Sequence, residues 1–158
     1  MSIEIITLSE EIKVIGLSYH KLGLPETYES IEGMWKTYSE KYRSRIENTV
    51  IPLTDYAVNA NLLTDTHEYI AGCAVTEIGV LEENWASFLI PTGKYIKHTS
   101  RVTSELHSTD IGAWAKANGV VINRDFMVEV YPDGVFASDS FNYVLHPILR
   151  SCIQLRQW

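Results

Sequence analysis

The segment FMVEVYP, Phe126 to Pro132, contains the acidic residue that is the best candidate in this chain for a chemical role. Alternate residues of a β-strand point to the same face, so Met127, Glu129 and Tyr131 are expected to share one face here. An ionised carboxylate among aromatic rings binds a lipophilic cation. A carboxylate whose pKa is raised by desolvation acts instead as a general acid or base. Because most strand glutamates are solvated surface groups, the pattern alone leaves the role of Glu129 open.

A second pair of chemically useful side chains lies in EYIAGCAV, Glu68 to Val75. Tyr69 and Cys73 are an even number of residues apart, so both are expected on one face of this strand. The hydroxyl of Tyr69 is either a hydrogen-bond donor to a ligand or part of a half-buried sheet tyrosine. No neighbouring motif supplies a base for Cys73, so a buried, unreactive thiol is favoured over a nucleophile.

Familiar metal, nucleotide and hydrolase motifs are missing from the sequence. The histidines show neither HExxH nor paired-ligand spacing: they are His20, His67, His98, His107 and His146. There is also no glycine-rich phosphate loop, GxSxG elbow or CxxC pair. We therefore predict no metal ion and no cofactor.

Composition favours one acidic globular domain spanning residues 1–158. The chain has 46% hydrophobic and 21% charged residues, and its net charge of -7 disfavours nucleic-acid binding. Lys36 to Arg45 alternates with Glu40 and tyrosines, which is typical of a solvated helix face. The acidic N-terminus does not resemble a signal peptide, and no apolar window is long enough for a membrane helix. With only Cys73 and Cys152, we expect a cytoplasmic protein without disulfides or membrane contact.

The first half of the chain reads as strand, helix, strand, strand. Ile12 to Tyr19 is rich in β-branched residues and predicts a strand, followed by a turn around Gly23. A helix is expected from Pro25, because aromatic and aliphatic residues then recur at helical spacing: Tyr28, Ile31, Trp35, Tyr38 and Tyr42. Two further strands are predicted, at Asp55 to Leu63 and Glu68 to Val75.

The second half repeats this order of elements. A strand is expected near Lys94 to Thr99, a helix over Thr103 to Asn118, and strands at Phe126 to Pro132 and Asn142 to Ile148. Trp85 lies between the halves in the polar stretch ENWAS, where it is a candidate lid. We therefore predict an α+β domain of two strand-helix-strand-strand units, roughly 10–78 and 86–149, which form one antiparallel sheet with two helices and a central cleft.

Three segments in this order resemble the GyrI-like small-molecule-binding family, which includes the effector-binding domains of AraC-type and MerR-type multidrug regulators. They are EYIAGCAV at Glu68 to Val75, IPTGKY at Ile90 to Tyr95 and FMVEVYP at Phe126 to Pro132. The resemblance covers roughly Ile12 to Ile148. The ending LRSCIQLRQW has no counterpart in the family, and no helix-turn-helix region flanks the domain, so we do not expect a complete transcription factor.

The resemblance implies a pocket between the halves, lined by aromatic residues around one buried carboxylate, for hydrophobic and often cationic compounds. It assigns the carboxylate to Glu129 and a pocket tyrosine to Tyr69. With these two residues, the candidates for ligand contact are Trp35, Tyr38, Tyr131, Trp85, Tyr143 and Cys73.

Three functions fit this resemblance. The first is a stand-alone small-molecule-binding protein in which Glu129 supplies charge and the aromatic residues supply stacking. The second is a hydrolase of cyclopropane-containing or other electrophilic compounds, with Glu129 and Tyr69 as catalytic residues. The third is a protein-interaction module similar to a gyrase-inhibiting relative. Because one fold hosts several activities, the site has to decide among them.

Overall fold

Eight antiparallel strands form one curved sheet in the computed structural model of the chain, which describes residues 1–25 and 27–149. Their order across the sheet is β1-β6-β8-β7-β3-β4-β2-β5. The strands are β1 (Ser2–Leu8), β2 (Ile12–Ser18), β3 (Asp55–Ala60), β4 (Glu68–Val75), β5 (Trp85–Ile90), β6 (Gly93–Ser100), β7 (Met127–Tyr131) and β8 (Asn142–Pro147). The predicted α+β class with an antiparallel sheet is confirmed. Residues 150–158, with Cys152, lie outside the described residues.

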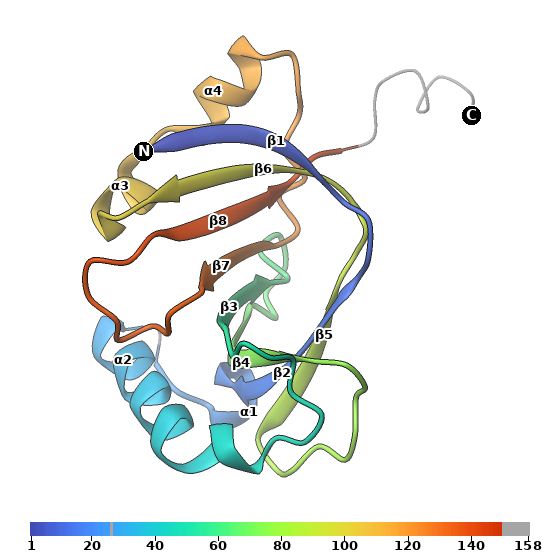
Figure 1. Ribbon diagram of the computed structural model, residues 1–158, viewed down its shortest axis with the longest axis vertical. Coiled ribbons are helices and arrows are strands. Elements are labelled where there is room, and N and C mark those ends of the chain that lie inside the picture. Colours follow the sequence, from blue (N-terminus) through green and yellow to red (C-terminus); the bar gives the residue numbers. More distant parts are fainter. Residues whose placement is uncertain (26, 150–158) are drawn as a thin grey trace.

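The helices gather on one side of this sheet (Figure 1). They are α1 (Tyr19–Leu22), α2 (Tyr28–Thr37), a π-helix η1 (Tyr38–Tyr42), a 3-10 turn η2 (Arg43–Arg45), α3 (Thr103–Ser108) and α4 (Ile111–Ala117). The side chain of Thr27 caps the start of α2 by accepting a hydrogen bond from the Ser30 amide. None of the helices in residues 1–25 and 27–149 is long and apolar enough to span a membrane.

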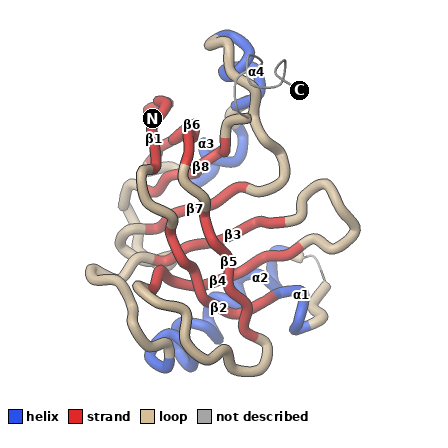
Figure 2. The backbone as a smooth tube through the Cα atoms, turned by 90° about the vertical axis from the view of Figure 1, so that its right-hand side faces the viewer, coloured by secondary structure: helices blue, strands red, loops and turns tan. Residues whose placement is uncertain are grey.

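The edge strand of each half of the sheet comes from the part of the chain that leads into the other half. β1 continues into β2 of the first half but pairs with β6 of the second, and β5 continues into β6 but pairs with β2. These four strands therefore make one long two-stranded ribbon, which crosses the other strands on the side away from the helices (Figure 2). Leu8 faces Gly93 and Ile12 faces Ile90. The connection from β1 to β2 therefore contains one more residue than the connection from β5 to β6.

Apolar cores lie on both faces of the sheet. The helix-covered face of the first half buries Trp35, Tyr38, Tyr69, Trp85 and Tyr131, with aliphatic neighbours. The opposite face, enclosed by the ribbon, buries Val14, Val58, Ile70, Tyr95, Val128, Val130 and Leu145. A smaller core beneath α4 contains Ile96, Ile111 and Ala115. The helix-covered face is therefore the one that carries the odd-numbered residues of β7, including Glu129.

Three features of the fold differ from the sequence predictions. The N-terminal residues form β1, which was not predicted, because its partner β6 is far away in the sequence. The stretch around Trp85 is the start of β5 rather than a polar connection. The predicted helix over Thr103 to Asn118 is two helices, since Asp110 caps a new one by accepting a hydrogen bond from the Ala113 amide.

Two facing glycines, Gly16 in β2 and Gly72 in β4, allow these strands to approach closely. A Cβ atom added at Gly72 would lie 2.2 Å from the carbonyl oxygen of Ile15, and one at Gly16 would lie 2.1 Å from that of Ala71. Both obstacles are backbone atoms, which cannot rotate away. The first half of the sheet therefore depends on the absence of side chains at this pair.

Gly72→Ala is expected to lower the free energy of unfolding by about 3 kcal/mol or more, because the new methyl group forces the two strands apart. Chemical denaturation monitored by tryptophan fluorescence measures this. The control is Gly33→Ala in α2, where an added Cβ meets no atom within 4 Å. We expect Gly33→Ala to be neutral or stabilising by up to about 1 kcal/mol. Equal stability of the two variants would contradict the close approach.

Candidate functional site

A row of eight residues crosses the helix-covered face of the sheet at its middle, one residue per strand. We call it the central row. From one edge to the other it runs Trp85, Leu17, Ala71, Ala57, Glu129, Val144, His98 and Ile3. Glu129 and Ala57 are the central pair, at the junction of β7 and β3 where the two halves meet. Glu129 is partly exposed, whereas Ala57 is fully buried.

Three aromatic side chains, Trp35, Tyr69 and Tyr131, form a cluster next to Glu129. The Tyr131 hydroxyl donates a hydrogen bond of 2.6 Å to Oε2 of Glu129. The indole N–H of Trp35 donates to the Tyr69 hydroxyl at 2.8 Å, and the Trp35 ring lies edge-on to Tyr131 with 6.2 Å between the centroids. Trp35 from α2 thus links the two tyrosines, which come from β4 and β7.

Both tyrosines near Glu129 stay protonated at every physiological pH. Burial raises the pKa of Tyr69 and of Tyr131, and the negative charge of Glu129 raises both further. Each hydroxyl therefore remains a neutral group that can donate one hydrogen bond. The site combines one carboxylate, two hydroxyls and an indole ring, a set suited to a cation or to a hydrogen-bond acceptor.

The other candidates for ligand contact lie in three different surroundings. Tyr38 and Cys73 are fully buried in the helix-side core, and burial raises the pKa of the Cys73 thiol. Trp85 is 3% exposed at the far end of the central row, where its ring lies edge-on to Tyr42, so it is a core residue and not a lid. Tyr143 points to the opposite face of the sheet, beneath the Lys97 ammonium at 4.4 Å from the ring centroid.

A buried ion pair fixes the position of the aromatic residues beside Glu129, and sequence reasoning missed it. Asp55, 1% exposed, accepts hydrogen bonds from Nη2 of Arg43 at 2.5 and 2.6 Å and from the Val135 amide at 2.9 Å. It also faces Tyr131 in the strand pairing. Arg43 lies within Lys36 to Arg45, predicted as a solvated helix face. That interpretation was wrong for Arg43, because the π-helix η1 turns it toward the sheet.

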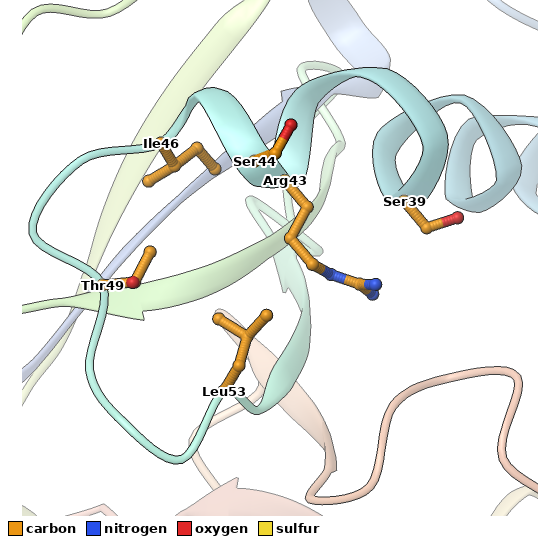
Figure 3. Close-up of a pocket in the computed structure, with 6 residues that line it drawn as sticks. All are labelled: Ser39, Arg43, Ser44, Ile46, Thr49 and Leu53. Carbon is orange, nitrogen blue, oxygen red and sulfur yellow. The ribbon is translucent and has the colours of Figure 1, made fainter.

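A cavity of about 330 Å³ opens beside Arg43 (Figure 3). Its lining consists of Ser39, Arg43, Ser44, Ile46, Thr49 and Leu53. The guanidinium there is already neutralised by Asp55. The lining of the cavity includes neither Glu129 nor Trp35, Tyr69 or Tyr131.

Polar side chains occupy the second half of the same sheet face. His98 and Asn142 are buried, and His146 is mostly buried. Burial lowers the pKa of His98, and it lowers the pKa of His146 to about 4. Both imidazoles are therefore neutral near pH 7. Nothing in the sequence pattern distinguished these histidines from surface ones, because each stands in a strand that alternates normally.

A family model described as integron-associated effector binding protein, Cass2, matches residues 4–143 of the chain. A search of the curated proteins finds no match to this sequence.

Several solved structures share the fold at low sequence identity. The EcmrR C-terminal domain has a TM-score of 0.70 at 14% identity, covering 95% of this chain and 98% of that one. The integron cassette protein VCH_CASS2 from Vibrio cholerae has a TM-score of 0.58 at 14% identity, with coverage of 93% and 95%. SAV2435 bound to tetraphenylphosphonium has a TM-score of 0.60 at 14% identity, with 94% of each chain covered. The predicted relation to effector-binding domains is confirmed.

The neutral state of His146 predicts a loss of stability in mild acid. Its pKa is lowered from 6.5 to about 4 by folding, so below pH 6.5 the unfolded chain binds a proton that the folded chain does not. The contribution of neutral His146 to the free energy of unfolding is complete above about pH 6.5. It is lost as the pH falls toward 4, which lowers the free energy of unfolding by up to about 3 kcal/mol. Urea denaturation between pH 4 and 7 is expected to show a flatter profile for His146→Gln.

His107→Gln, at an exposed position of α3, is the matched control and should keep the wild-type profile. His98 contributes in the same direction, so the single variant removes only part of the slope. Superimposable profiles of wild type and His146→Gln would refute the assignment.

Proposed function

Because the chain belongs to the family of integron-associated effector-binding proteins, we propose that it binds hydrophobic, cationic small molecules at Glu129, against Trp35, Tyr69 and Tyr131. The effector is sequestered or sensed rather than converted. We further propose that this takes place in the cytoplasm.

The observation that carries the proposal is the electrostatic state of Glu129. Of the ion pairs found among the described residues, one joins Arg43 to Asp55 and the other joins Arg45 to Glu82, and neither includes Glu129. Its hydrogen bond comes from the neutral hydroxyl of Tyr131. A partly enclosed carboxylate without a cationic neighbour is stabilised by a positively charged ligand. Glu129 therefore favours a cation as its partner.

The aromatic residues beside Glu129 support a ligand that is also apolar. A cation above the face of Trp35, Tyr69 or Tyr131 is attracted by the ring quadrupole, and its apolar groups lose contact with water. The structural relative SAV2435 is bound to tetraphenylphosphonium, a cation of this kind. This compound is therefore a suitable probe for the present chain. The hydrolase activity at Glu129 and Tyr69 and the interaction with a protein partner stay predictions.

Glu129→Gln is expected to weaken the binding of tetraphenylphosphonium about tenfold to a hundredfold, because the neutral amide no longer balances the ligand charge. Isothermal titration calorimetry measures the affinity of both proteins. Glu4→Gln in β1 is the control, since it makes the same change of charge at an exposed position of the edge strand. Equal affinity of Glu129→Gln and wild type would falsify the electrostatic role.

A further inference from the structure

We propose that His98, Asn142 and His146 form a hydrogen-bonding subsite, which takes a hydroxyl or amide group of the same ligand whose cation lies at Glu129. This inference rests on the proposed function and extends it from one charged group to a ligand with two ends.

The three side chains carry buried hydrogen-bonding atoms that are unused. Among the described residues, no hydrogen-bond partner is found for Nδ1 and Nε2 of His98, for Oδ1 of Asn142 or for Nε2 of His146. His98 has no exposed surface, and Asn142 is 7% exposed. Buried polar atoms in proteins nearly always have a partner, because leaving one unpaired is unfavourable. A cluster of such atoms on one sheet face therefore indicates a binding role.

The fold itself does not require polar residues at these positions. Counting outward from the Ala57–Glu129 pair along the strand register, His98 occupies the place that Leu17 holds in the first half. By the same count, Asn142 corresponds to Tyr69, and His146 corresponds to Cys73. Leu17 and Cys73 pack well in the core of the first half. Apolar side chains would therefore suit the second half as well, and the polar ones need another explanation.

The cluster lies within reach of a ligand at Glu129. Only Val144 separates His98 from Glu129 in the central row, so the two residues are two strand spacings apart, on the order of 10 Å. The strand register places all of these side chains on the same face of the sheet as Glu129. An arm of the ligand would pass over Val144 and beneath α3, which is only six residues long and has to shift.

The chemistry of the cluster selects a neutral polar group. Burial lowers the pKa of both histidines. At His98, Glu105 opposes this shift and the N-terminal ammonium adds to it. Arg124 adds to the lowering of the pKa of His146. A neutral imidazole offers one donor and one acceptor, and the Asn142 oxygen is an acceptor. A hydroxyl or primary amide, which both donates and accepts, complements this set. A second cation would not.

The test compares two probes that differ in one hydroxyl group: hexyltriphenylphosphonium and hydroxyhexyltriphenylphosphonium, with the hydroxyl at the chain end. Calorimetry is expected to show that wild type binds the hydroxyl probe about fivefold to tenfold more tightly, as one additional hydrogen bond predicts. His98→Leu is expected to remove this preference. His107→Leu, on the exposed side of α3, should keep the preference.

The outcomes separate the subsite from the proposed function. If wild type binds both probes equally and Glu129→Gln weakens both, the subsite is refuted and the cation site stands. If neither probe binds, both proposals fail. Equal weakening of both probes by His98→Leu, with a lower melting temperature, would show that His98 only supports the fold. Should His98→Leu not fold, Asn142→Leu gives the same comparison.

Discussion

The carboxylate of Asp55 is the buried charge on which the arrangement of the first half depends. Moving an unpaired carboxylate into the interior is costly by several kcal/mol, so a strand that begins with a 1% exposed aspartate needs a cation beside it. Arg43 reaches Asp55 because the chain continues from α2 through the π-helix η1. The same carboxylate accepts the Val135 amide, which holds the connection between β7 and β8 against the core. One neutralised charge therefore fixes α2, and with it Trp35, over Tyr69 and Tyr131.

Most strands were predictable because their alternation and flanking turns are local signals. The strand Glu68–Val75 has the bounds that the sequence predicted. What escaped prediction is non-local. β1 and β5 are strands because each pairs with an arm of the opposite half, and nothing within SIEIITL or WASFLI states which partner is available. The prediction for the basic stretch around Arg43 was wrong for a similar reason, because Asp55, the partner of Arg43, lies beyond the end of the helix. Pattern reasoning finds elements, whereas the exchange of edge strands is a property of the whole chain.

In the candidate site, too, local relations were predictable from the sequence and non-local ones were not. Alternation alone placed Glu129 and Tyr131 on one face, and the structure joins them by a hydrogen bond. Tyr143 was grouped with them although it stands opposite Val130, and a shift of one residue in register moves a side chain to the other face of the sheet. Trp85 shares the face of Glu129 but lies four strands away along the central row. The polar residues His98, Asn142 and His146 were invisible in the sequence, because only the strand order brings β6 and β8 beside β7.

The duplicated frame also explains why the site has to be asymmetric. Glu129 and Ala57 occupy corresponding positions of the two halves, and they face each other directly across β7 and β3. Two glutamates at this pair would place like charges about 5 Å apart, which destabilises an antiparallel pair. One carboxylate beside one methyl group avoids this repulsion. The same asymmetry then extends outward, since β4 carries Tyr69 next to the strand of Ala57, whereas β8 carries Asn142 and His146 next to the strand of Glu129. A ligand bound across the junction as proposed would meet different chemistry at its two ends, and this difference would set its orientation.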